Sequence, residues 1–297
     1  MKAGIINNDE RSSRNKKAKQ NVFFWIIRVF SYSIVLILFA ILGFIIINGI
    51  SVISWDFLTE APTEGMTSGG IFPAIVGTMC LVVGSIVIAF PIGVMSAIYM
   101  SEYATNKYFK TIIRVMTNNL AGIPSIVFGL FGMALFVNKL GFGDSIIAGS
   151  LTLGILVLPI IIRTTEEALN AVDDSYRQGS LALGATKWQT TRKVVLPIAL
   201  PNILTGLILS IGRVSGETAP ILFTVAAYFL PSLPTGIYDQ VMALPYHLYV
   251  LTTSGTDIAS ARPIAYGTAL VLIFIILIVN ISANLLRRRF QKKYKVK

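Results

Sequence analysis

The chain has 297 residues, of which 54% are hydrophobic and only 13% are charged, and its mean hydropathy is +0.73. These values exclude an ordinary soluble domain and place the chain among membrane proteins with several spans. The formal net charge of +11 would suit a nucleic-acid-binding protein, so the positions of the basic residues have to decide between the two classes.

Six apolar segments are each long enough, at about 20 residues, to cross a bilayer as a helix. Prolines interrupt several of them, including Pro124 in the third and Pro220 in the fifth. The alternating pattern that is typical of a transmembrane barrel is missing. We therefore predict an all-α membrane protein with six transmembrane helices, at residues 29–50, 71–98, 112–137, 145–162, 198–229 and 264–286.

Lysine and arginine residues alternate with the predicted spans along the chain. Of the 25 basic residues, 22 lie in segments that fall on the same side of a six-span topology: residues 2–28, 107–114, 163–193 and 287–297. Cytoplasmic loops of membrane proteins collect Lys and Arg in this way. We therefore expect both termini in the cytoplasm, and we interpret the net charge as a topology signal, with no nucleic acid as partner.

Polar segments flank the predicted spans at both ends of the chain. Residues 1–21 are basic and show no apolar period, so we expect a mobile cytoplasmic tail. Residues 22–286 hold the six spans and are interpreted as one membrane domain, with a large cytoplasmic loop at residues 163–197. Residues 287–297 are expected to form a second basic cytoplasmic tail.

The loop at residues 163–197 contains two signals for the start of a helix. Residues 175–178 and residues 186–189 both have the Ser/Thr-x-x-Gln spacing of a capping box. Gly184 lies between them, where a helix can end. The sequence therefore predicts two short cytoplasmic helices. Helices this short persist only when they pack against a partner or against the inner ends of the spans themselves. A structured cytoplasmic loop indicates that something outside the bilayer acts on it.

This loop resembles the coupling loop of ATP-binding-cassette (ABC) importer permeases. That loop has the pattern Glu-Ala-Ala, three residues, Gly, nine residues, and then Ile-x-Leu-Pro. The chain has Gln178-Gly179-Ser180, Gly184 and then Val194, Leu196 and Pro197 at the same offsets, although the first three positions depart from the consensus. In that family the first helix of the loop sits in a groove of a separate ATPase subunit and transmits its closure. The resemblance therefore implies a coupling role for Tyr176, Gln178, Gly179, Ser180, Leu181 and Gly184.

The fifth predicted span carries two charges, Arg213 and Glu217. Each would cost about 2.5–3.5 kcal/mol at the centre of a membrane helix, and four residues apart they would share a helix face and neutralise each other in part. One interpretation is a structural pair that locks the helices together. The other is a polar lane in which Arg213 contacts an oxyanion such as phosphate and Glu217 holds Arg213 or weakens anion binding. In the second case Ser125 and Thr218 would add hydroxyl donors.

Residues 216–224, Gly-Glu-Thr-Ala-Pro-Ile-Leu-Phe-Thr, closely resemble the signature of the PstA family of permease subunits of phosphate-specific ABC importers. Residues 119–132 and 69–78 are similar to it too, although the motif at 119–132 is shared with the sister family PstC. The resemblance covers about residues 66–286. It implies a type I ABC importer permease fold, location in the cell membrane and import of inorganic phosphate. The implied partners are a PstC-like permease, two ATPase subunits and an extracytoplasmic phosphate-binding protein.

The chain has no Gly-x4-Gly-Lys-Ser/Thr loop, so we expect the ATPase subunits to use ATP and Mg²⁺. With one His, one Cys and a single acid within a predicted span, no catalytic or metal site is expected and the chain is not predicted to be an enzyme. Other functions remain open: a permease for another oxyanion such as sulfate or molybdate, or the PstC-like sister subunit. An ion-coupled secondary transporter is a different class, for which we find no convincing internal repeat.

Overall fold

Helices dominate the computed structural model, which describes residues 2–254 and 258–294. The long helices are α1 (Lys2–Gly49), α3 (Phe72–Ile98), α6 (Ile146–Asn170), α9 (Leu196–Ser215) and α12 (Ile258–Tyr294). The shorter α-helices are α2 (Trp55–Thr59), α4 (Lys107–Ala121), α5 (Ser125–Gly132), α7 (Asp174–Ala182), α8 (Lys187–Thr190), α10 (Ala219–Leu222) and α11 (Leu244–Thr253). Strands β1 (Pro62–Thr63) and β2 (Ser68–Gly69) pair in an antiparallel hairpin. Single 3-10 turns are η1 (Ile50–Val52) and η2 (Glu64–Met66), and π-helical segments are η3 (Tyr99–Tyr103), η4 (Met133–Lys139) and η5 (Thr191–Val195).

In the described residues, five helical segments are long and apolar enough to cross a membrane: Gln20–Val52, Phe72–Tyr103, Ile146–Asn170, Lys187–Ser215 and Ala261–Lys292. A sixth span results when α4 is taken together with the continuous helix formed by α5 and η4. These two halves are bent by 100° relative to each other. The bend falls at Gly122–Pro124, where proline has no N–H to continue the helix. The predicted all-α membrane fold is confirmed, with the third span bent at Pro124.

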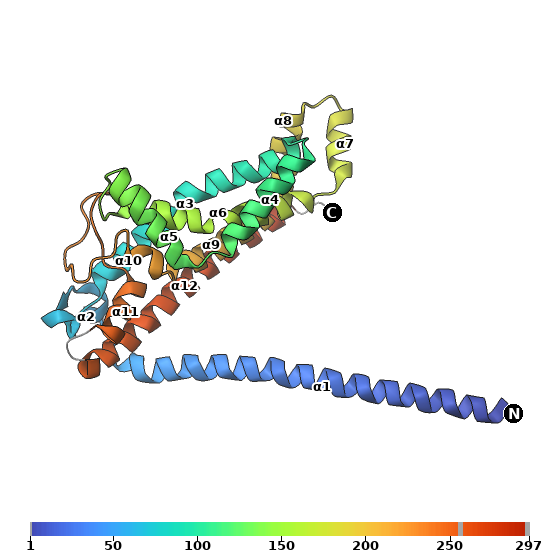
Figure 1. The fold of residues 1–297 in the computed structure, drawn as a ribbon, viewed down its shortest axis with the longest axis horizontal. Helices are drawn as coiled ribbons and strands as arrows, with labels where there is room; N and C mark the ends of the chain where they lie inside the picture. The colour runs from blue at the N-terminus through green and yellow to red at the C-terminus, as the bar shows by residue number, and fades with distance from the viewer. Residues whose placement is uncertain (1, 255–257, 295–297) are drawn as a thin grey trace.

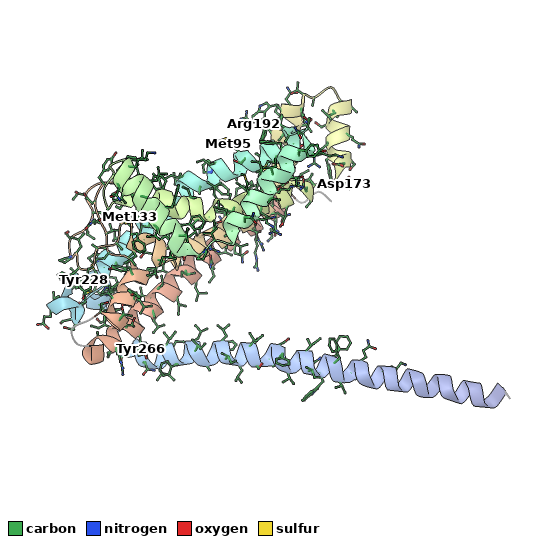
Figure 2. All side chains as sticks on the ribbon, viewed as in Figure 1. Met95, Met133, Asp173, Arg192, Tyr228 and Tyr266 are labelled. Carbon is green, nitrogen blue, oxygen red and sulfur yellow. The ribbon has the colours of Figure 1, made fainter. Side chains whose placement is uncertain are left out.

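Helix α1 meets the other helices at its C-terminal end and extends away from them (Figure 1). At this junction, where Figure 2 labels Tyr266, the rings of Phe44 and Tyr266 are 5.5 Å apart and Gly49 lies against the Tyr266 backbone. Most side chains from Val22 to Ile47 are exposed and apolar, as expected for a helix surrounded by lipid. Residues 2–21 continue the same helix. Their mobility stays a prediction.

Helices α3, α6 and α9 form the centre of the molecule. Gly84 and Gly93 of α3 lie against Ser150 and Ile161 of α6, and Gly206 of α9 lies against Thr164 of α6. Residues without a side chain let helix backbones approach closely, which strengthens van der Waals contact where no hydrophobic force acts between helices. The buried core between these helices consists of Leu81, Ala89, Leu153, Leu156, Val157, Ile161 and Val214, among others.

An irregular segment at residues 223–243 closes the end of the molecule that lies farthest from α7 (Figure 1). The backbones of Val225 and Ala227 pair with Val241 at 3.2 and 3.0 Å. The N–H of Leu244, at the start of α11, donates to the Thr78 hydroxyl of α3 at 2.8 Å. These bonds satisfy main-chain groups that have no helix to pair with, and they fix the segment to α3.

Gly77 of α3 should be sensitive to any side chain, because a Cβ there would collide with the Met242 carbonyl oxygen, a backbone atom that cannot rotate away. We expect Gly77→Ala to destabilise the folded chain by about 1–3 kcal/mol, which is typical of overpacking. The measurement is the thermal unfolding midpoint of the detergent-purified protein. Gly43→Ala is the matched control, since no heavy atom lies within 4 Å of its Cβ position. Equal midpoints for the two variants would contradict the packing described above.

Candidate functional site

Helix α9 ends inside the predicted fifth span. Its last turn carries Arg213, the helix stops at Ser215, and the Gly216 N–H bonds the Arg213 carbonyl at 3.2 Å. The sequence predicted an interruption at Pro220, yet the helix has already ended five residues earlier. Glu217 therefore lies beyond the helix, and the expectation that Arg213 and Glu217 share a helix face is wrong.

Arg213 and Glu217 nevertheless form an ion pair, with 3.4 Å between Nε of Arg213 and Oε1 of Glu217. The Glu217 side chain is 15% exposed, whereas that of Arg213 is 39% exposed. Within the described residues, the guanidinium has no other hydrogen bond or ion pair. The pair therefore anchors one edge of the guanidinium and leaves other N–H donors available to a ligand.

Glu217 also lines a small cavity between α3, α6 and the end of α9. Thr78, Leu153 and Ser215 are among the other lining residues, and the room for a water centre is about 10 Å³. That volume suffices for about one water molecule. The cavity is too small to be a pore in this arrangement of helices, so passage of a solute at this position requires the helices to move apart.

Ser125 and Thr218 lie on elements that pack against each other. Ser125 is the first residue of α5, directly after the 100° bend, and Thr218 precedes α10. Gly129 of α5 lies against Ala219 and Pro220 of α10. Both hydroxyl-bearing residues are half-buried, and in the described residues neither side chain is hydrogen-bonded to Arg213 or Glu217. The structure brings the four residues to neighbouring elements and puts only the ion pair in direct contact.

The predicted cytoplasmic loop is shorter than expected, because α6 continues to Asn170 and α9 begins at Leu196. Helix α7 has Asp173 as N-cap, whose carboxylate accepts from the Ser175 N–H at 2.8 Å. The prediction of a capping box at residues 175–178 is therefore wrong. Hydrogen bonds from the side chain and backbone of Ser175 hold the pKa of Asp173 below its ordinary value, which favours a negative charge at the helix N-terminus.

The second predicted helix start is confirmed. The Thr186 hydroxyl accepts from the Gln189 N–H at 3.3 Å, and the Gln189 side chain accepts from the Thr186 N–H at 2.9 Å. Gly184 adopts a φ of +83°, a conformation that favours glycine, so the role predicted for it between the helices is also confirmed.

Five of the six residues expected to couple to an ATPase are exposed: Tyr176, Gln178, Gly179, Leu181 and Gly184. The sixth, Ser180, is half-buried and its hydroxyl lies 2.9 Å from the Thr190 hydroxyl, which ties α7 to α8. Leu183 and Trp188 add apolar surface at 91% and 57% exposure. An exposed apolar patch on a polar loop is typical of a surface that another protein covers.

Two contacts that the sequence did not reveal attach α7 and α8 to the end of the second span. Arg177 pairs with Glu102 at 2.8 Å and donates to the carbonyls of Leu169 and Val172 at 2.8 and 2.7 Å. The hydrogen bond to Glu102 raises the pKa of the Arg177 guanidinium above its ordinary value. The Lys187 ammonium lies 5.3 Å from the centre of the Tyr103 ring.

The sequence prediction also misses a buried acid in the fourth span. Glu166 of α6 is 8% exposed and is paired with Arg114 of α4. The sequence predicts that residues 163–170 belong to the cytoplasmic loop, whereas α6 continues to Asn170 and includes Glu166. The pair ties α4 to α6, and Asn118, Arg163, Glu167 and Asn170 complete an open pocket of about 290 Å³ around it. In the described residues, no three His, Cys, Asp or Glu residues are grouped so that they could hold a metal ion.

Comparison with known proteins gives consistent results. The family described as "Binding-protein-dependent transport system inner membrane component" matches residues 89–296. The probable ABC transporter permease protein YqgI of Bacillus subtilis is 35% identical over 268 residues, which cover 86% of this chain and 91% of that protein. The phosphate transport system permease protein PstA of Mycobacterium leprae is 39% identical over 215 residues, covering 72% of this chain and 69% of that protein. The phosphate transport system permease protein PstA 1 of Mycobacterium tuberculosis (strain H37Rv) is 36% identical over 234 residues, covering 78% of this chain and 74% of that protein.

Solved structures support the fold. A bacterial alginate ABC transporter matches with a TM-score of 0.65 at 16% identity, covering 93% of this chain and 98% of that chain. The inward-facing MetNI methionine ABC transporter matches with a TM-score of 0.55 at 19% identity, covering 74% of this chain and 94% of that chain. The type I ABC importer permease fold and the family resemblance, both predicted from the motifs, are confirmed.

Removing Arg177 should loosen α7 from the membrane helices, because the Arg177 and Glu102 side chains are only 18% and 8% exposed. Breaking a buried ion pair typically costs about 3–5 kcal/mol. We expect Arg177→Met to accelerate amide hydrogen exchange in residues 174–182 by about tenfold or more. Arg163→Met is the control, since its pair with Glu167 is about two-thirds exposed on both sides. Unchanged exchange in the Arg177 variant would show that α7 is held by other contacts.

Proposed function

Because this chain belongs to the family of binding-protein-dependent transport system inner membrane components, we propose that it is the permease subunit through which an ATP-driven importer moves inorganic phosphate. The observation that carries the proposal is the half-exposed Arg213 guanidinium, held by Glu217 where α9 ends among the membrane helices. Relatives whose names specify phosphate transport support this choice of anion.

Phosphate suits the chemistry of this position. A guanidinium presents N–H donors in a planar fork that matches two oxygens of a phosphate group, and hydrogen bonds to charged groups are about twice as strong as neutral ones. Glu217 neutralises part of the Arg213 charge when no anion is present, which lowers the cost of keeping a cation among apolar helices. It also repels a bound anion, so that binding stays weak enough for release. Ser125 and Thr218, on the neighbouring α5 and α10, supply hydroxyl donors to the same path.

The partners are proposed from the missing nucleotide-binding motif and from the exposed residues of α7. Its sequence has no phosphate-cradling nucleotide loop, so ATP and Mg²⁺ belong to two separate ATPase subunits, and this chain is not an enzyme. Tyr176, Leu181 and their exposed neighbours on α7 receive one of those subunits. A PstC-like permease supplies the other half of the path, and an extracytoplasmic binding protein delivers phosphate.

The orientation follows from the coupling helices. The N-terminal part of α1 and the C-terminal part of α12 lie toward the same side of the view as α7 and α8, although α1 extends away from the other helices (Figure 1). If α7 and α8 meet an ATPase in the cytoplasm, both termini are cytoplasmic, which agrees with the distribution of basic residues. The chain is then a multi-pass protein of the cell membrane, with α2, α11 and the β-hairpin on the outer side.

The test is phosphate uptake at low phosphate concentration by cells from which this chain has been deleted. These cells are compared with the same cells after the wild-type chain or the Arg213→Ala variant has been restored. We expect wild type to restore uptake and Arg213→Ala to lower it about 10- to 100-fold, which corresponds to losing a charge-assisted hydrogen bond of about 1.5–3 kcal/mol. Arg163→Ala, which removes an exposed arginine from the same chain, serves as the control.

Three other outcomes would change the conclusion. Competition of uptake by sulfate or molybdate would assign the chain to another oxyanion. Full uptake by the Arg213→Ala variant would remove Arg213 from the path. Loss of the assembled complex in Arg213→Ala, with assembly and uptake both retained by Arg213→Lys, would show that the ion pair has a structural role, because lysine keeps the pair but lacks the planar fork.

A further inference from the structure

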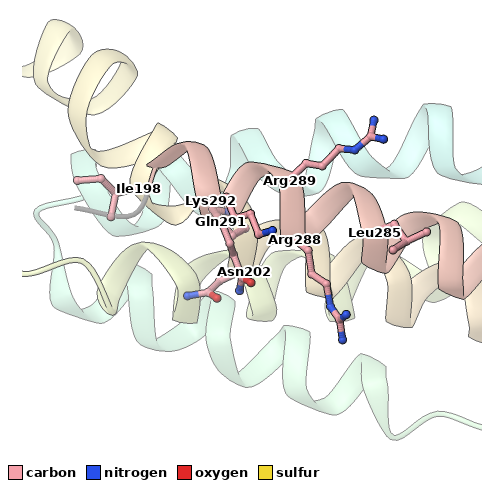
Figure 3. Close-up of a pocket in the computed structure, with 8 residues that line it drawn as sticks. Ile198, Asn202, Leu285, Arg288, Arg289, Gln291 and Lys292 are labelled. Carbon is pink, nitrogen blue, oxygen red and sulfur yellow. The ribbon is translucent and has the colours of Figure 1, made fainter. Parts of the chain in front are cut away.

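An open cavity of about 790 Å³ lies between the start of α9 and the end of α12 (Figure 3). It is far from the Arg213–Glu217 pair along α9, and none of its lining residues belongs to α7 or α8. The proposed transport path and the coupling helices therefore do not explain it. Its walls combine basic, amide-bearing and apolar side chains.

The basic wall comes from Arg288, Arg289 and Lys292 of α12, all of which are exposed. Arg288 and Lys292 are one helical turn apart and so lie on the same face of α12. In Figure 3, Arg288 and Arg289 leave the helix in opposite directions, and Lys292 lies near Gln291 and Asn202. Basic side chains of α12 and the amide side chains of Gln291 and Asn202 thus line the cavity together.

Nothing on these two helices neutralises the three cations. The sequences of α9 and α12 contain no Asp or Glu. Among the ion pairs of residues 2–254 and 258–294, none involves Arg288, Arg289 or Lys292. Like charges one turn apart on a helix, such as Arg288 and Lys292, repel one another, and a bound anion relieves that repulsion. The electrostatics therefore point to an anionic ligand.

The two helices that form the cavity are tied together beside it. Arg287 donates from Nη1 to the Thr205 hydroxyl of α9 at 3.0 Å. It is half-buried, in contrast to the exposed cations that follow it. This bond fixes α12 against α9, so the cavity is a feature of packed helices and does not depend on one mobile side chain.

The remaining wall is apolar and consists of Ile198, Pro201 and Leu285. The cavity lies at the end of the spanning segment Ala261–Lys292, where a helix leaves the hydrocarbon for the headgroup layer. A small inorganic anion or a nucleotide would leave this apolar wall in water. A phospholipid matches both parts, because its phosphate meets the cations and its upper acyl chain meets Leu285 and Ile198.

We propose that this cavity binds the headgroup of an anionic phospholipid, such as phosphatidylglycerol, from the leaflet at the α7–α8 end of the molecule. The site is separate from the transport path and does not depend on which anion is transported. A bound lipid at this position fills the gap between α9 and α12, and α9 is the helix whose far end carries Arg213. Lipid composition would then affect how firmly the two helices are held together.

The proposal is tested on the assembled, detergent-purified complex by native mass spectrometry with added short-chain phosphatidylglycerol or phosphatidylcholine. We expect phosphatidylglycerol to bind and phosphatidylcholine to bind more weakly. The double variant Arg288→Gln, Lys292→Gln should weaken phosphatidylglycerol binding about 30-fold, which corresponds to about 1 kcal/mol for each basic residue near a membrane surface. The matched control is Lys107→Gln, Lys110→Gln on α4, which removes two positive charges outside the cavity.

Several results would overturn the proposal. Equal binding of phosphatidylglycerol by the cavity variant and the α4 control would show that the lipid is held elsewhere. Equal competition by inorganic phosphate or by glycerol phosphate, which have no acyl chain, would show that the cavity takes a free phosphate group. Failure of any lipid to bind, together with retention of an acidic peptide by the wild-type cavity alone, would assign the site to a protein partner. Because binding is measured without transport, each result is independent of the proposed function.

Discussion

The close packing of α3 against α6 is the constraint on which the other elements depend. Glycines on α3 allow its backbone to approach Ser150 and Ile161 of α6, and α6 in turn receives α9 at Thr164. Helices in lipid gain no hydrophobic free energy from touching each other, so a tight fit of small residues has to hold them. A side chain added at these glycines would separate the helices and displace everything that packs on them.

This frame explains why irregular backbone is tolerated among the membrane helices. Unpaired N–H and C=O groups cost several kcal/mol in hydrocarbon, so non-helical segments occur only where protein or a water-filled cavity surrounds them. The break after Ser215 meets this condition: α10 packs against α5, and residues 225–227 pair with Val241. The same break carries Arg213 and Glu217. The charged pair therefore lies at the same break as the irregular backbone, with Glu217 largely buried and Arg213 partly exposed.

The fold was readable from the sequence where its causes are local, and the site only in part. Apolar length predicted the spans, and the Thr186–Gln189 capping box was predicted because both its bonds join residues three positions apart. The start of α7 was misplaced because Asp173, Asp174 and Ser175 are all good capping residues, and spacing alone does not choose among them. The Arg177–Glu102 pair joins residues 75 positions apart, so a single sequence gives no signal for it. Glu166 was assigned to the loop because a charge usually ends a span, whereas here Arg114 compensates it.

The contacts that the sequence does not reveal connect α7 and α8, through α3, to the cavity beside Glu217. Arg177 and Lys187 attach the coupling helices to Glu102 and Tyr103, at one end of the second span. Thr78, near the other end of that span, lines the same cavity as Glu217. The two points are separated by about 36 Å along a helix, which is a stiff element compared with a loop. If α7 and α8 receive an ATPase subunit, as proposed, α3 is the element that would carry their displacement to the cavity wall. There, the hydrogen bond from the Leu244 N–H to the Thr78 hydroxyl joins the start of α11 to α3, so the two would shift together at the cavity that Glu217 lines.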